Sequence, residues 1–263
     1  MDKRFWEIDA WRGLAIVSMV FYHFMWDLLF FGVVRDVALQ SGGWKYFQRS
    51  IASSFIFLAG VSLVVSYQQV KVREAAKTGG AAKNKNLGKK GGSVGWQKFL
   101  RRGAKVFAWG LVMGIGVRVA GVGRIDFGVL HLIGFSIMAS YPFLHFRWIN
   151  IGLWALFNFI ARFLQEPLVD HYWLTWLGFI PPNYSYLDFF PVFPWFGVAL
   201  LGIGVGNLLY VDYLQEWRKW LPNLAALPPI RFLRFLGGRS LVIYLLHQPI
   251  LFVLLYLWFA IAG

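Results

Sequence analysis

Long apolar segments dominate this chain and limit the folds that it can adopt. A helix needs about 20 apolar residues to cross a bilayer. Seven segments approach or reach that length, namely 12–34, 50–69, 104–123, 127–145, 148–164, 189–211 and 240–262. Inside hydrocarbon, backbone polar groups must bond within the protein, which favours helices. The sequence therefore predicts an all-α fold, a polytopic transmembrane helical bundle of about seven spans.

The composition agrees with a membrane protein. Hydrophobic residues make up 58% of the chain and charged residues 14%, whereas soluble domains carry about 25% charged residues. The chain has no cysteine, which excludes disulfides and thiolate catalysis. The first apolar segment is longer than the roughly 7–15 residues of a signal-peptide core, so we expect it to stay as an anchor.

Positive charge is concentrated between the second and third predicted spans. The net charge is +14, and residues 71–105 hold eleven Lys and Arg against one acid, Glu74. Cytoplasmic loops are enriched in Lys and Arg. With a cytoplasmic N-terminus, 20 of the 26 basic residues fall inside. We therefore expect a cytoplasmic N-terminus in the cell (inner) membrane. We also expect the basic residues to interact with the lipid bilayer and not with nucleic acid.

The chain is interpreted as a single transmembrane domain, residues 1–263. Within it, residues 71–101 are rich in Gly, Lys and Asn and are expected to form a mobile cytoplasmic loop. The loop can act as a topology determinant and spacer, or attract an anionic cofactor or lipid. The segment 171–180 is apolar but too short to cross, so we expect it to be interfacial or re-entrant.

Small residues in the predicted spans indicate close helix packing. Gly110 and Gly114 form one GxxxG pattern, and Gly202 and Gly206 form another. Gly60 lies in a stretch of small residues in the second span. Such positions let helix backbones approach closely.

Two ionisable residues, His23 and Asp27, lie within the first predicted span. An ionisable group in hydrocarbon costs roughly 2.5 kcal/mol or more, so it is a functional candidate by default. Residues four apart share a helix face. We expect the carboxylate to hold one ring nitrogen of His23 and to leave the other as a proton acceptor. A purely structural hydrogen bond is the alternative.

Other polar residues in the spans are candidates for binding. Arg12 precedes His23 by about 16 Å along a helix and can hold a phosphate near the cytoplasmic entry. His131 and His247 can each be a ligand or a satisfied bundle histidine. Pro249 frees a backbone carbonyl near His247. Arg118 can pair with an acid or bind substrate. No metal is expected, because the histidines lack a local ligand spacing such as HExxH.

Four stretches carry a family resemblance. EIDAWRGLAIVSMVFYHFMWDL resembles the opening of the membrane acetyltransferases related to heparan-α-glucosaminide N-acetyltransferase, in particular their small prokaryotic branch of unknown function. FGVLHLIGFS, FPVFPWFGVALLGIGVGNLL and FLGGRSLVIYLLHQPILF are similar to the same branch. The first and last stretches also resemble the acyltransferase-3 membrane enzymes, whose first helix carries an arginine and then a catalytic histidine. Arg12 and His23 match those positions.

The resemblance implies an acyltransferase that uses acetyl-CoA as co-substrate. The acetyl group would reach a hydroxyl or amine of a sugar or glycan near the outer side of the membrane. His23 would be the base and Asp27 would orient it. The resemblance also suggests binding roles for further residues: Arg12, Arg231 and Arg234 for the CoA phosphates, and His131, His247, Arg118 and Trp195 for the acceptor or thioester pocket.

The chain also departs from the eukaryotic enzyme. That enzyme has asparagine in place of His23 and its essential histidine in the following lumenal loop, which has no counterpart here. His23 must then serve, by direct transfer or through an acyl-histidine. The chain is shorter, so heparan sulfate is not expected as acceptor. A proton-coupled transporter and a non-catalytic scaffold are the alternatives, and a homodimer is possible.

Overall fold

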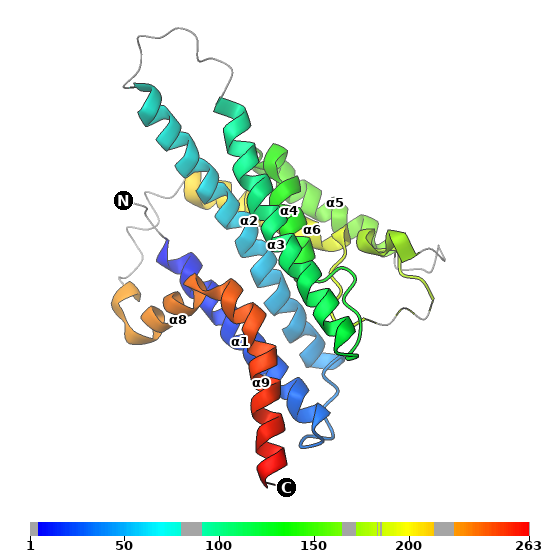
Figure 1. Cartoon of the computed structure of the whole chain (residues 1–263). Helices are drawn as coiled ribbons and strands as arrows, with labels where there is room; N and C mark the ends of the chain where they lie inside the picture. The colour runs from blue at the N-terminus through cyan, green and yellow to red at the C-terminus, as the bar shows by residue number, and fades with distance from the viewer. Residues whose placement is uncertain are drawn as a thin grey trace. The chain divides into compact units, whose positions relative to one another are not determined.

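The computed structural model describes residues 5–79, 91–164, 172–182, 184, 186–212 and 224–262. Every regular element in these ranges is helical, in agreement with the predicted all-α class. Figure 1 shows the main helices. They are α1 (Trp6–Phe30), α2 (Gly42–Gly79), α3 (Gly91–Val119), α4 (Val129–Ala139), α5 (Trp148–Leu164), α6 (Val192–Asn207), α8 (Pro228–Gly238) and α9 (Ser240–Ala262). Short helical turns cover Tyr141–Phe143 (η1), Tyr172–Leu177 (η2), Leu208–Asp212 (η3) and Leu224–Ala226 (η4).

Each of the seven predicted spans contains a helix, and four of the described helical segments are long and apolar enough to cross a membrane. These are Trp6–Phe30, Gly42–Arg73, Val192–Val211 and Ser240–Ile261. The helices α4 and α5 are shorter, with 11 and 17 residues. The count of seven spans and the orientation therefore stay predictions. The segment 171–180 contains only the six-residue turn η2 among its described residues, as expected for a piece that does not cross.

The predicted loop 71–101 is helical at both ends. Helix α2 continues to Gly79 and α3 begins at Gly91. The prediction of a loop is wrong in these parts, because the sequence there includes good helix formers such as Ala, Glu, Lys, Arg and Gln. The remaining residues, 80–90, lie outside the described residues.

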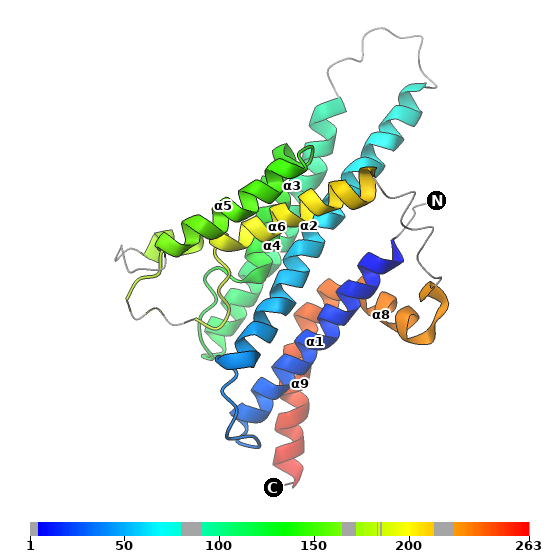
Figure 2. The same ribbon diagram turned by 180° about the vertical axis from the view of Figure 1, so that it is seen from behind.

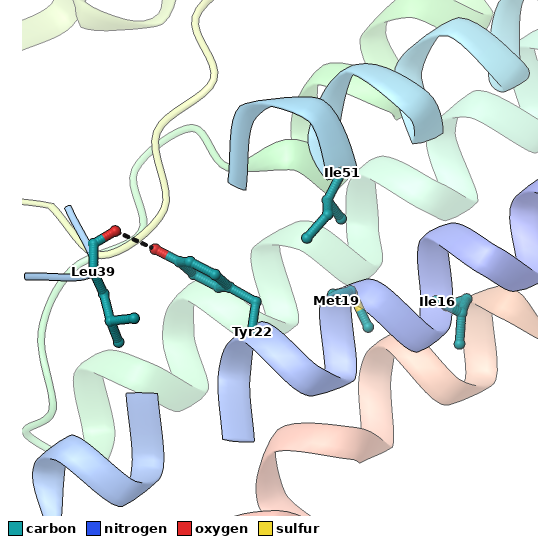
Figure 3. Packing of buried hydrophobic residues seen from close by; sticks show 5 residues of the cluster. All are labelled: Ile16, Met19, Tyr22, Leu39 and Ile51. Carbon is teal, nitrogen blue, oxygen red and sulfur yellow. Dashed lines mark hydrogen bonds between the residues drawn. The ribbon is translucent and has the colours of Figure 1, made fainter. Parts of the chain in front are cut away.

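The chain forms two compact units, and their boundary falls within α2. The first unit comprises residues 1–55 and 221–263, and the second comprises residues 56–220. Figure 3 shows the core of the first unit, built from Ile16, Met19, Tyr22, Leu39 and Ile51. The hydroxyl of Tyr22 donates to the carbonyl of Leu39 at 3.1 Å, which ties the loop after α1 to that helix.

Helix α1 is packed at both ends within the first unit. Near its start, α8 lies against it (Figure 2), and the backbones are in close contact because the residues there are glycines. A Cβ at Gly13 would overlap the carbonyl of Leu233, and one at Gly237 would overlap the carbonyl of Asp9. Near its end, the ring of Phe31 lies 5.3 Å from that of Phe252 on α9.

The second unit pairs α3 with α4 and α5 with α6, and each pair lies side by side in Figures 1 and 2. The predicted small-residue contacts are confirmed. A Cβ at Gly60 would overlap the carbonyl of Ala199, and one at Gly202 would overlap that of Phe57. A Cβ at Gly110 would lie 2.9 Å from Nδ1 of His131. These glycines allow α2 to pack against α6, and α3 against α4.

Candidate active site

The predicted hydrogen bond between His23 and Asp27 is absent from the described structure. Asp27 is 3% exposed, and its Oδ1 accepts a hydrogen bond of 2.6 Å from Nε2 of Gln248 on α9. Its Oδ2 has no partner among the described residues. The expectation that Asp27 orients His23 was therefore wrong in this arrangement, because the carboxylate is held from a different helix.

His247, on α9, lies beside His23. The two ring centroids are 4.9 Å apart and the ring planes are inclined by 59°. Nδ1 of His247 lies 2.8 Å from the carbonyl oxygen of Tyr244 and 3.2 Å from that of Ile243. Carbonyl oxygens only accept, so Nδ1 carries the proton and donates it.

When the ring is neutral, the other nitrogen of His247 is an acceptor. Nε2 of this neutral tautomer has a free lone pair, and the atom is buried with no partner among the described residues. When a hydrogen bond holds one ring nitrogen as the donor, the tautomer of the neutral ring is fixed and the other nitrogen is the acceptor. The sequence predicted this arrangement for His23, but the structure gives it to His247.

Three buried polar atoms on α1 and α9 share this lack of a partner. They are Oδ2 of Asp27, Nε2 of His247 and Oε1 of Gln248, and the statement holds for the part of the chain that the structure describes. A buried unsatisfied polar group costs about 1–3 kcal/mol, so each one requires an explanation such as a catalytic role or a bound molecule. Helices α1 and α9 contact each other here through Asp27 with Gln248 and through His23 with His247, and we call these four residues the polar site.

The three arginines predicted to bind phosphate lie in different surroundings. Arg12 pairs with Asp9 one turn earlier, with Nη1 3.0 Å from Oδ1. Arg234 on α8 donates from Nη1 to the carbonyl of Ala225 at 3.2 Å, which holds the turn η4. Arg231 is exposed. Because it precedes Leu233 by two residues, about 200° around the helix, it lies on the side of α8 opposite to the contact with Gly13.

A small cavity lies on another face of α1. It has a volume of about 150 Å³ and is lined by α1 and the first part of α2, through Trp11, Leu14, Ala15, Ser18, Ser50, Ile51 and Ser54. Ser18 and His23 are five residues apart, which places them about 140° apart around the helix. The cavity is therefore separate from the polar site at His23.

The remaining predicted pocket residues belong to the second unit. Nδ1 of His131 accepts a hydrogen bond of 3.2 Å from the backbone N–H of Gly128 and so caps the start of α4. Nη2 of Arg118 lies 3.3 Å from Oδ1 of Asp126. The ring of Trp195 packs 4.8 Å from that of Phe190. Each of these three side chains has a structural partner within its own unit.

The described residues contain no group of three His, Cys, Asp or Glu side chains that could hold a metal ion. Sequence reasoning also missed a residue of the site, Gln248, which contacts Asp27 directly. The signal that could have found it is a polar amide within an apolar span, between His247 and Pro249. A polar side chain at that depth requires a partner from a neighbouring helix.

The comparisons with known proteins give one match. A family model described as heparan-alpha-glucosaminide N-acetyltransferase, catalytic, matches residues 4–249. The match covers all of α1 and the part of α9 up to Pro249, so it includes every residue of the polar site. No curated protein and no solved structure matches the chain.

Proposed function

The chain belongs to the catalytic family of heparan-α-glucosaminide N-acetyltransferase, a family of membrane acetyltransferases, and on that premise we propose that it transfers an acetyl group from acetyl-CoA to a sugar or glycan. The acceptor group is a hydroxyl or an amine. Four helices of suitable length and apolarity agree with a protein of the membrane. The proposal requires a buried base near a site where two substrates can meet.

The observation that carries the proposal is the state of His247. Its Nδ1 donates to backbone carbonyls of its own helix, and its Nε2 is buried with a free lone pair. A neutral imidazole in this tautomer is ready to accept a proton. Positioned general bases contribute typically 10²–10⁴-fold to a rate, so loss of this nitrogen has a measurable consequence.

In the proposed reaction, Nε2 of His247 accepts the proton of the acceptor hydroxyl or amine. The acceptor oxygen or nitrogen attacks the thioester carbonyl carbon, and a tetrahedral intermediate forms. The carbon–sulfur bond then breaks, and the leaving CoA thiolate takes the proton from the imidazolium. The products are the acetylated acceptor and CoA with a free thiol, so the base returns to its neutral form.

His23 shares the site through its ring contact with His247. Placed 4.9 Å away centroid to centroid, it can contact the same substrates and exchange the proton with His247. Asp27 and Gln248 act as a pair that fixes α1 against α9 and offers two further acceptor oxygens to the substrates. Catalysis is thus assigned to both histidines, with His247 as the better-oriented base.

The CoA phosphates are assigned to Arg12 and Arg234. Arginine recognises phosphate through several N–H groups. Contacts that hold these side chains in place include the ion pair of Arg12 with Asp9 and the hydrogen bond of Arg234 to the carbonyl of Ala225. Supply of acetyl-CoA from the cytoplasm and transfer near the outer side rest on the distribution of basic residues, 20 of 26 on the side of the N-terminus.

Labelled acetyl-CoA tests the function. Proteoliposomes with the full chain should transfer label to an amino sugar or a hydroxylated sugar, and those with the double variant His23→Ala/His247→Ala should not. Equal transfer by both would contradict the site. Uptake of solute without any acyl-CoA, and no transfer of label by the wild type, would favour a transporter instead.

A further inference from the structure

Helix α8 (Pro228–Gly238) lies at the point where the chain enters α9. Its inner side is fixed to α1, because a Cβ at Gly237 would overlap the carbonyl of Asp9. Figures 1 and 2 show that the chain turns sharply between α8 and α9. Since α1 and α9 are both long and apolar enough to cross a membrane, α8 lies at the level where crossing helices begin.

The outer side of α8 is both aromatic and basic. Phe232 is 59% exposed and Phe235 is 53% exposed. Arg231 and Arg239 are also exposed, and Arg231 shares a side of the helix with Phe235, four residues later. The guanidinium carbon of Arg239 lies 3.9 Å from the ring centroid of Phe235. The side chains thus form a continuous surface, two phenylalanines flanked by two arginines, which we call the α8 outer face.

The segment that carries this surface has charge of one sign. Residues 221–263 contain three arginines and no Asp or Glu. Arg234 is engaged by the carbonyl of Ala225, whereas Arg231 and Arg239 have no hydrogen-bonding or ionic partner among the described residues. Two exposed guanidinium groups beside two exposed aromatic rings fit an occupant with anionic groups next to apolar chains.

We propose that the α8 outer face binds anionic phospholipid at the membrane surface. Phe232 and Phe235 insert at the boundary of headgroups and acyl chains, and Arg231 and Arg239 contact lipid phosphates. Helices that lie in the plane of a membrane combine these features, with Phe on the buried side and basic residues at headgroup level. The helix then fixes the depth of α1, and with it the depth of His23.

A phosphate of CoA is the other source of the same chemistry, but the geometry favours lipid. Arg231 lies on the side of α8 opposite to Gly13, and therefore away from Arg12. Exposed rings beside the guanidinium groups fit acyl chains and have no use in binding a soluble phosphate. The proposal is independent of the acetyltransferase assignment, because it concerns a different surface and is tested without activity.

Lipid selection by the purified full chain tests the charges. The chain is mixed with equal amounts of phosphatidylglycerol and phosphatidylcholine, and retained lipid is measured by native mass spectrometry. Each arginine at a membrane surface favours anionic lipid by about five-fold. Arg231→Gln/Arg239→Gln should therefore lower the preference for phosphatidylglycerol by about ten-fold or more, whereas the matched pair Arg35→Gln/Arg49→Gln should keep it. An unchanged preference, or a loss of CoA binding alone, would overturn the proposal.

Depth measurement tests the aromatic anchors with less risk to folding. The chain has no cysteine, so a nitroxide can be attached at one introduced site, Phe232→Cys, in phosphatidylglycerol vesicles. We then measure how accessible the nitroxide is to oxygen and to a water-soluble nickel complex. Both accessibilities should fall between the values for a nitroxide at Ile250→Cys, within α9, and one at Asp36→Cys, in the loop after α1. A value equal to that of Asp36→Cys means exposure to water, and exclusion of both reagents means coverage by protein. Either result would overturn the proposal.

Discussion

Gln248 on α9 donates a hydrogen bond of 2.6 Å to the buried carboxylate of Asp27 on α1. This contact joins two residues that are 221 positions apart in the sequence. Gln248 follows His247, whose ring contacts that of His23. It replaces the contact within α1 that the spacing of His23 and Asp27 predicts. The register of α1 against α9, and so the distance between the two histidines, depends on it.

The Asp27–Gln248 pair should show strong coupling in stability. Gln248→Leu leaves the buried carboxylate without its donor, and Asp27→Leu leaves the amide unpaired. Each single change should lower the free energy of unfolding by about 1–3 kcal/mol. The double variant should lose less than the sum of the two, because neither polar group then stays buried alone. Thermal unfolding of the four proteins in detergent gives the coupling, and simple additivity would count against the contact.

Gly13 should not tolerate a side chain. A Cβ there would overlap the carbonyl of Leu233, which is backbone and has little freedom to move. Gly13→Ala should therefore destabilise the packing of α8 on α1 by about 1–3 kcal/mol. Gly43→Ala is the matched control in the same unit, because no atom lies within 4 Å of a Cβ at that position. Comparable losses in melting temperature for both variants would refute the close approach.

Asp188 should make the second unit sensitive to pH. Its Oδ2 accepts from the backbone N–H of Val129 at 3.0 Å, and burial raises the pKa of this carboxyl to about 6. The folded chain then holds the proton more tightly than the unfolded chain. The contribution to stability is present at pH 4 and declines as the pH rises through 6. Asp188→Asn removes this titration.

Melting temperatures between pH 4 and 7.5 can isolate this effect. The difference between wild type and Asp188→Asn should shift against the wild type as the pH rises. Other titrating groups cancel, since both proteins carry them. A difference that shifts toward the wild type with rising pH would mean that the pKa of Asp188 is lowered in the folded chain.

Hydropathy located the helices well but missed their ends. The first span was predicted at 12–34, and α1 runs from Trp6 to Phe30. Its start is earlier because Glu7 and Asp9 are compatible with the first turn of a helix, although they lower the hydropathy. Its end is earlier because Gly32 takes a positive φ of 70°, which terminates a helix.

The sequence predicts the ionisable residues of the candidate site but not the contacts between them. An ionisable residue inside an apolar segment is visible in one sequence, so His23, Asp27 and His247 were found. Contacts between helices depend on their register and rotation, and i,i+4 spacing carries no information about these. The pairing of Asp27 with Gln248 and the contact of His23 with His247 therefore required the structure. The capping role of His131 was hidden in the same way, because its partner is a backbone N–H.

Acetyl transfer by single histidine variants tests the central claim most directly. With labelled acetyl-CoA and the wild-type level of folded protein, His247→Ala should lower kcat by 10²-fold or more, as expected for loss of a positioned base. His23→Ala should also lower it. His145→Gln, in the second unit, keeps an acceptor for the hydroxyl of Tyr67 and should transfer at the wild-type rate. Wild-type transfer by His247→Ala would contradict the account.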